Sequence, residues 1–159
     1  MESLMPCLWF DDNAEEAVDF YLSIFKNSKK LNTARFSDAA AKASGRPLGS
    51  VMTIAFQLNG QDFLALNGGP IFKFSEAISF VVRCDSQDEI DFYWEKLADG
   101  GTIEQCGWLK DRYGLSWQVV PSNIGELLTG DGKKAERVMA AVLQMKKIDM
   151  NILKRAYDQ

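Results

Sequence analysis

Hydrophobic residues follow two different spacings along the chain, and the same succession of spacings occurs twice. Short apolar runs at residues 8–10 and 78–82 are typical of buried strands. Each run is followed by a segment, at residues 15–25 and 88–97, in which apolar residues recur at helical spacing. This spacing predicts two helices, each with one apolar face against a sheet.

Polar residues mark where the two helices begin. Ser86 and Glu89 have the spacing of a capping box, in which a hydroxyl and a carboxylate each bind a backbone N–H near the first turn. Asp12 and Glu15 form a similar pair before the first helix. We therefore expect both helices to start directly after these capping residues.

Strands are predicted after each helix. The candidates, in chain order, are residues 31–36, 51–58, 61–66, 102–109 and 115–120. Asn59-Gly60 lies between two of them and is a strong signal for a tight β-hairpin. Each half of the chain therefore predicts a β-α-β-β-β module.

The two halves also share sequence. Asp19-Phe20-Tyr21 recurs 72 residues later (from 19 to 91) as Asp91-Phe92-Tyr93, and at the same offset Leu8-Trp9-Phe10 aligns with Phe80-Val81-Val82. We predict an α+β fold in which two β-α-β-β-β modules form one curved mixed sheet, followed by C-terminal helices. The predicted organisation is a single domain of residues 1–159, with modules at 4–70 and 76–121 and a helical tail at 133–157.

Two segments lie outside the repeat. Residues 37–50 are rich in Ala, Ser and Gly, which predicts a mobile loop that is either a lid over a site or a plain surface insertion. The tail carries an apolar stripe, and Asp149 is placed to cap a second short helix within it. This apolar stripe must cover either the chain's own sheet or a partner subunit.

Composition limits the chemistry that the chain can perform. The chain has 159 residues and no histidine, which excludes Ser-His-Asp and Cys-His catalysis and every His-ligated zinc or iron site. The formal net charge is −4 and no run of five basic residues occurs, which argues against a nucleic-acid partner. No apolar run approaches the roughly 20 residues of a membrane span, so no membrane partner is expected.

The cysteines and the N-terminus suggest a compartment. Cys7, Cys84 and Cys106 are odd in number, widely spaced and without a Cys-x-x-Cys pair, which is typical of reduced thiols. The first residues show neither the basic region nor the apolar run of a secretory signal. We therefore expect a cytoplasmic protein.

Several segments carry a family resemblance. They are Pro6–Asp11 with the helix at 17–25 behind it, Leu66–Pro70, Phe72–Phe80, Cys106–Gln118 and Gln144–Asp149. In these segments the chain resembles the PhnB-like proteins of the vicinal oxygen chelate superfamily, which includes glyoxalase I and bleomycin-resistance proteins. The resemblance implies the paired-module fold and a homodimer.

Proteins of this group often carry the label 3-demethylubiquinone-9 3-methyltransferase. A typical S-adenosylmethionine methyltransferase has a Rossmann-like sheet with a Gly-rich turn between a strand and a helix. The glycine pairs Gly68-Gly69 and Gly100-Gly101 form no Gly-x-Gly at such a position. The sequence therefore argues against methyl transfer as the activity.

The resemblance also implies where a metal would be held. In the resembling metalloenzymes each module gives two ligands from its first and last strands, on the concave face of the sheet. The corresponding positions here, to within one residue, are near Pro6, Ala65, Ser79 and Gln118, and only Gln118 could ligate well. We therefore expect no metal and no other cofactor.

Without a metal, the concave face becomes a candidate small-molecule pocket, mostly apolar with a few hydrogen-bonding groups. Alternation along the strands gives the candidate ligand-binding residues Phe10, Asn67, Ser79, Arg83, Trp108, Ser116 and Gln118. The other interpretation is that the polar members of this set lie at solvated ends of strands.

Cys106 is the one weak candidate for a catalytic residue. Sharing a strand face with Trp108, and near Lys110 and Arg112, it could be a nucleophile with a lowered pKa. A small buried thiol packed beside aromatic residues is the more common outcome for such a cysteine. Two functions stay open: a metal-free module that binds a small molecule, or an enzyme of the same fold that uses Cys106 or an unusual metal. The missing histidines and carboxylates favour the first.

Overall fold

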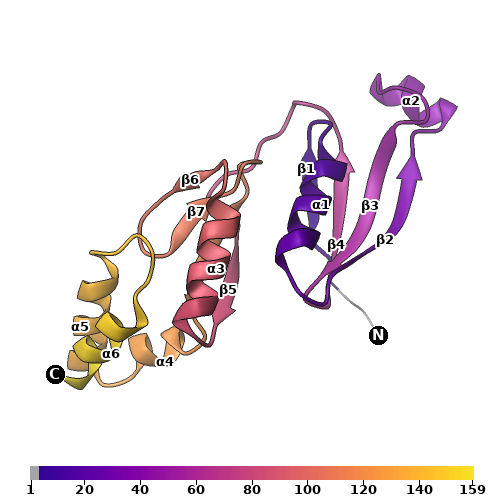
Figure 1. The fold of residues 1–159 in the computed structure, drawn as a ribbon. Helices are drawn as coiled ribbons and strands as arrows, with labels where there is room; N and C mark the ends of the chain where they lie inside the picture. Colours follow the sequence, from indigo (N-terminus) through magenta and orange to yellow (C-terminus); the bar gives the residue numbers. More distant parts are fainter. Residues whose placement is uncertain (1–3) are drawn as a thin grey trace. The chain divides into compact units, whose positions relative to one another are not determined.

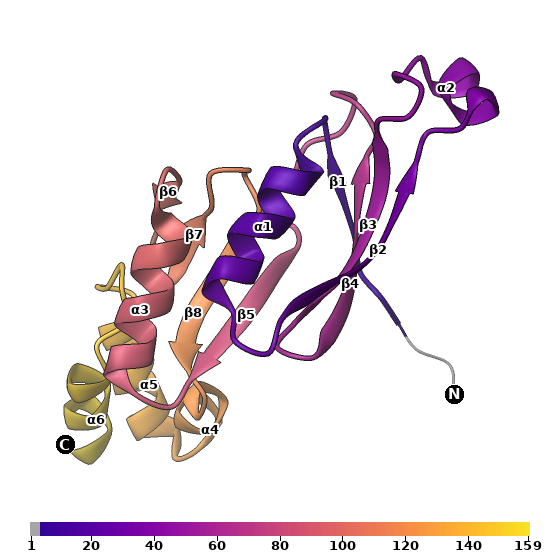
Figure 2. The same ribbon diagram turned by 45° about the vertical axis from the view of Figure 1, so that its right-hand side comes forward.

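The computed structural model describes residues 4–159, and in it the chain divides into two compact units (Figure 1). The first unit ends at Lys73 and the second is Phe74–Gln159. This boundary lies in the short segment between the two expected modules. Each unit carries its own four-stranded mixed sheet with a helix on one face (Figure 2).

The first unit has the strand order β1-β4-β3-β2. Its elements are β1 (Cys7–Phe10), α1 (Ala14–Ile24), β2 (Lys29–Arg35), α2 (Asp38–Ser44), β3 (Val51–Leu58) and β4 (Gln61–Asn67). β1 pairs in parallel with β4, and the other neighbours are antiparallel. The hairpin between β3 and β4 turns at Asn59 and Gly60, both with positive φ, which confirms the turn predicted from the sequence.

The second unit repeats this path with the strand order β5-β8-β7-β6. Its elements are β5 (Ser79–Cys84), α3 (Gln87–Ala98), β6 (Thr102–Ile103), β7 (Trp108–Lys110), β8 (Ser116–Pro121), α4 (Ile124–Thr129), α5 (Gly132–Val142) and α6 (Met150–Asp158). The first strand again pairs in parallel with the last. The predicted pair of β-α-β-β-β modules followed by helices is therefore confirmed. None of the described helices is long and apolar enough to cross a membrane.

In each unit one sheet face is buried under the helix. Ile90 and Leu97 of α3 are fully buried, as are Leu109 and Val119 from alternate positions of β7 and β8. Burying an aliphatic side chain of this size stabilises a fold by roughly 1.5–3 kcal/mol. The opposite face of the second sheet has no helix of the β-α-β-β-β module on it, and we call it the open face.

The two helix starts differ in how they are capped. Ser86 Oγ accepts from the N–H of Glu89 at 3.2 Å, which confirms the predicted cap of α3. The first helix does not use Asp12. Its N-cap position is Asn13, whose side chain makes no capping hydrogen bond, and the N–H of Ala14 instead donates to Oδ1 of the distant Asn67 at 2.9 Å.

Residues 37–50 contain a helix rather than only a loop. Ser37 Oγ accepts from the N–H of Ala40, and Gly45 ends α2 in the left-handed conformation that glycine adopts without strain. No side chain of α2 is buried. The helix forms because its alanines favour it and both ends are capped, although none of its side chains is fully buried.

The predicted strand at residues 102–109 is interrupted. β6 and β7 are separated by a turn in which Cys106 and Gly107 both have positive φ. The N–H groups of these two residues donate to the carbonyls of Met145 and Lys146 at 2.8 and 2.7 Å. The turn therefore serves as the attachment point of the C-terminal tail.

The tail packs on its own unit, one of the two expected possibilities. Ile148 is 1% exposed, and Lys147 forms an ion pair of 2.6 Å with Asp91 of α3. Asp149 accepts from the N–H of Ile152, which confirms the predicted cap of the last helix. The short helix α4 was not predicted from the sequence.

Candidate functional site

The open face of the second sheet brings together most of the residues predicted for ligand binding. β8 pairs Ser116 with Ser79 and Gln118 with Val81 on one side, and Gln118 with Trp108 on the other. Because side chains alternate along strands, all five lie on the face opposite α3. Arg83 follows on the same face of β5 and is exposed.

Hydrogen bonding on this face is incomplete. Gln118 Nε2 donates to Ser79 Oγ at 2.9 Å, which links β8 to β5. Ser116 is 0% exposed, and within residues 4–159 its hydroxyl oxygen has no hydrogen-bond partner. Leaving a buried hydroxyl unpaired costs roughly 1–3 kcal/mol, so the position calls for an explanation.

A charged cluster lies beside Ser116. Lys110, its partner on β7, forms ion pairs with Glu76 and, at 3.9 Å, with Glu104. The hydrogen bond between the two groups lowers the pKa of Glu76 and raises the pKa of Lys110. Both therefore stay charged over a wide pH range, and the ammonium neutralises carboxylates that could otherwise attract a metal.

The structure fixes the positions that a chelate site would use. Ser79 and Cys7 are equivalent by the 72-residue repeat, and Leu66 pairs with Trp9 of β1 as Gln118 pairs with Val81 of β5. The expected positions Pro6 and Ala65 therefore move by one residue, to Cys7 and Leu66. A leucine offers no ligand, and burial raises the pKa of the Cys7 thiol.

The donor set does not fit a divalent cation. Over residues 4–159 no three Asp, Glu or Cys side chains are placed so that they could hold one ion. The two glutamates nearest the open face already share Lys110. Ser79 and Gln118 by themselves are a poor match for zinc, which prefers four nitrogen or sulfur ligands.

Phe10 and Asn67 lie on the helix-covered face of the first sheet, not on the predicted ligand-binding face. Phe10 is 3% exposed and pairs with Asn67, which is 4% exposed. Asn67 uses both ends of its amide inside the core, since Oδ1 accepts from Ala14 and Nδ2 donates to Val51 O at 3.0 Å. We therefore leave both residues out of the proposed site.

Cys106 lies in the turn before β7 rather than on a strand face with Trp108. The cations expected to activate it are engaged elsewhere, Lys110 with Glu76 and Arg112 with Asp99. The buried Cys84 is a still weaker nucleophile, because burial raises its pKa to about 11. No observation on the described residues favours a cysteine-dependent reaction.

Two sets of residues on the faces opposite the helices were missed from the sequence. In the second unit the missed set is the Glu76–Lys110–Glu104 cluster. Alternation along the strand places Lys110 on the same face as Trp108 and could have indicated its position. In the first unit it is Trp9, whose indole donates to Gly69 O at 2.9 Å and contacts the Phe72 ring edge-on at 4.9 Å. The repeat aligns Trp9 with Val81, and this alignment could have shown on which sheet face Trp9 lies.

Comparisons with known proteins agree with this architecture. The family model "3-demethylubiquinone-9 3-methyltransferase" matches residues 2–120. A putative 3-demethylubiquinone-9 3-methyltransferase, PhnB protein, from Bacillus cereus is 32% identical with a TM-score of 0.65, over 75% of this chain and 99% of that chain. No curated protein matches the chain.

More distant structures share the fold alone. Protein PA1353 from Pseudomonas aeruginosa is 20% identical with a TM-score of 0.61, over 76% of this chain and 98% of that chain. The fosfomycin resistance protein FosX from Listeria monocytogenes is 16% identical with a TM-score of 0.52, over 81% and 98%. The chain therefore belongs to the 3-demethylubiquinone-9 3-methyltransferase family, as a PhnB-like member of the vicinal oxygen chelate superfamily.

Proposed function

We propose that the protein is a small-molecule-binding module that works without a metal, and that the open face of the second sheet contacts the ligand. The observation that carries this proposal is the buried hydroxyl of Ser116, which has no hydrogen-bond partner among residues 4–159. Its hydrogen-bonding capacity is unused in the protein alone, so a polar group of a ligand, or a water beside it, would complete it.

The neighbouring groups define the chemistry of such a ligand. Trp108 and the half-exposed Val81 offer apolar contact, while Ser79 and Gln118 offer an adjacent pair of hydrogen-bonding groups. Ligand sites commonly combine an apolar wall with a few placed polar groups. We propose a partly apolar molecule with at least one hydrogen-bond acceptor or hydroxyl directed at Ser116, which it would reach once the groups covering that hydroxyl move aside.

The family's methyltransferase label is not part of this proposal. The four-stranded sheets of both units have β-α-β-β-β connections, without the Gly-rich strand-to-helix turn that positions S-adenosylmethionine in Rossmann-like enzymes. A fold or family name constrains function less than the groups present in a site. The homodimer and the cytoplasmic location expected from the sequence stay predictions, and the homodimer would show directly in sedimentation.

Divalent metals are expected to leave the melting temperature unchanged within about 1 °C, because no three Asp, Glu or Cys side chains of residues 4–159 are placed to hold one ion. A metal bound at 100 times its Kd would instead stabilise the fold by about 2.7 kcal/mol, which corresponds to roughly 5–10 °C. Thermal unfolding with Mn²⁺, Co²⁺, Ni²⁺ and Zn²⁺ measures this, with elemental analysis of the purified protein beside it. Stoichiometric metal would contradict the metal-free proposal.

Ser116→Ala is expected to raise the free energy of unfolding by about 1 kcal/mol in the protein without ligand, because it removes a buried hydroxyl that no group of the described chain bonds. The same change should weaken binding at the open face. Ser79→Ala is the matched control, since it breaks the bond to Gln118 and should lower stability by about 1 kcal/mol. Urea unfolding of the unmodified protein, Ser116→Ala and Ser79→Ala measures the two changes in stability.

Binding itself is tested by screening a fragment set against the ¹⁵N-labelled protein. Hits should shift the Trp108 indole and Gln118 side-chain signals, and the shifts should weaken in Ser116→Ala. A screen whose hits all leave these signals unchanged would refute the open face as the site. Loss of stability in Ser116→Ala would show that the hydroxyl already has a partner and would remove the main support for the proposal.

A further inference from the structure

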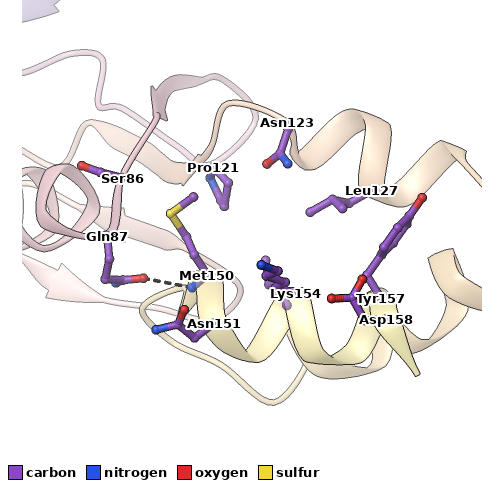
Figure 3. Close-up of a pocket in the computed structure, with 11 residues that line it drawn as sticks. Ser86, Gln87, Pro121, Asn123, Leu127, Met150, Asn151, Lys154, Tyr157 and Asp158 are labelled. Carbon is purple, nitrogen blue, oxygen red and sulfur yellow. Dashed lines mark hydrogen bonds between the residues drawn. The ribbon is translucent and has the colours of Figure 1, made fainter.

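A cavity lies mainly in the C-terminal part of the chain, where nine of its eleven lining residues come after the end of the family model at residue 120. It is a groove of about 510 Å³ between α4 and α6, closed at one end by Pro121 and the start of α3 (Figure 3). Small-molecule sites typically measure roughly 300–1,000 Å³. The volume is therefore sufficient for a small organic ligand.

The lining of the groove is mixed, with apolar side chains on both of its sides among polar ones. Met150 and Tyr157 point from α6 toward the side on which Pro121 and Leu127 lie (Figure 3). The helix rises about 12 Å from Met150 to Asp158, which sets the length of the groove. Apolar side chains along this length would bury the body of an aliphatic or aromatic molecule.

The start of the groove is held rigidly. Gln87 Oε1 accepts from the N–H of Met150 at 2.9 Å (Figure 3). Gln87 Nε2 also donates to Ile148 O at 3.1 Å. One side chain of α3 thus fixes the loop before α6 and the first turn of that helix. A site whose walls are already ordered loses less conformational entropy when it binds a ligand.

Charges around the groove favour an anion. Lys154 lines its middle, and no ion pair within residues 4–159 engages this ammonium. Asp158 lies one turn further, but Arg137 donates to the carbonyls of Ala156 and Tyr157 at 2.9 and 3.4 Å beside it. The backbone carbonyls at the end of α6 are thus offset by a guanidinium, and Lys154 makes no ion pair within residues 4–159, although the Asp158 carboxylate also lines the groove.

A second cation adds positive charge near the groove. Lys134 Nζ lies 4.6 Å from the centre of the Tyr157 ring, whose residue lines the groove. We infer that the groove binds a small amphipathic carboxylate, with its charged group on Lys154 and its apolar body on Pro121, Leu127 and Met150. This site is separate from the open face and does not depend on the function proposed for it.

The test uses three probes that differ only in their head group: 4-phenylbutyrate, 4-phenylbutanamide and 4-phenylbutylamine. Each is titrated into the full ¹⁵N-labelled chain, and the shifts of Leu127, Met150 and Lys154 are followed. The acid should bind most tightly and the amine least. Lys154→Met should weaken binding of the acid about tenfold, the loss expected for one charge-assisted contact, and leave the amide unchanged.

Two further variants keep the test selective. Lys96→Met removes an exposed lysine of α3 that does not line the groove, and it should change no affinity. Leu127→Trp should fill the groove and weaken all three probes. The inference is overturned if the acid causes no saturable shift at the groove, if the amine binds as tightly as the acid, or if Lys154→Met leaves the affinity unchanged. Shifts confined to Trp108 and Gln118 would overturn it too, while supporting the function proposed for the open face.

Discussion

Replacing Asp111 by alanine is expected to lower the free energy of unfolding by about 4 kcal/mol, a large share of a domain's total stability. Asp111 is 3% exposed, and its carboxylate accepts from the N–H groups of Tyr113 and Leu115 at 2.8 and 3.1 Å. Its second oxygen accepts from Trp117 Nε1 at 2.9 Å. Alanine would leave these three donors without their acceptor in or near the core.

The loss would also reach the candidate site. Asp111 forms the turn between β7 and β8, and that turn sets the register in which Lys110 pairs with Ser116. A loosened turn would therefore disturb the open face, although Asp111 itself points to the other side. We expect any ligand binding at the open face to weaken together with stability in this variant.

Urea unfolding followed by tryptophan fluorescence measures the change. Asp111→Asn keeps an oxygen acceptor and is expected to lose roughly half as much stability. Asp99→Ala is the exposed control, because its ion pair with Arg112 lies at the surface and contributes less than about 1 kcal/mol. A loss below about 1 kcal/mol in Asp111→Ala would show that the carboxylate is not the anchor of this turn.

Elements set by local sequence were predictable, and the facing of the strands was predictable only in part. The Asn59-Gly60 turn and the Ser86 cap depend on neighbouring residues, and both are found where they were expected. In the second unit, alternation correctly placed Ser79 and Gln118 on one face. In the first unit the prediction placed Phe10, instead of Trp9, on the ligand-binding face of β1. The side chains predicted for the two faces of this sheet were therefore exchanged.

The repeat already contained the information needed to avoid this exchange. At an offset of 72 residues (from 7 to 79), Ser79 aligns with Cys7 and Val81 with Trp9, so Phe10 belongs with the helix-facing Val82. A strand has a side-chain period of two, so an error of one residue moves every side chain to the other face. Comparing the two modules with each other is therefore a sharper guide than reading either alone.

Other features were beyond sequence analysis because they depend on contacts between distant residues. The bonds from Cys106 and Gly107 to the tail join positions about 40 residues apart, and no local pattern signals them. Burial of the Ser116 hydroxyl likewise depends on what the neighbouring strands place above it. The α4–α6 groove exists only once the tail has folded back onto its own unit.

Asn67→Ala is expected to lower the free energy of unfolding by about 3 kcal/mol, because two buried backbone groups lose their partners at once. The N–H of Ala14 loses the acceptor that caps α1, and the carbonyl of Val51 loses its donor. Both residues are almost fully buried, so water cannot replace either bond without opening the core. Chemical denaturation of the whole chain measures the loss.

Asn13→Ala is the matched control at the same helix end. Asn13 occupies the N-cap position, but its side chain makes no capping bond, so its replacement should cost less than about 0.5 kcal/mol. Asn67→Asp should lie between the two, since it keeps the acceptor for Ala14 and loses the donor to Val51. Equal losses in Asn13→Ala and Asn67→Ala would contradict capping by Asn67. Unchanged stability in Asn67→Ala would return this residue to the candidate ligand-binding set, because an asparagine that holds ligand rather than backbone can be removed without weakening the fold.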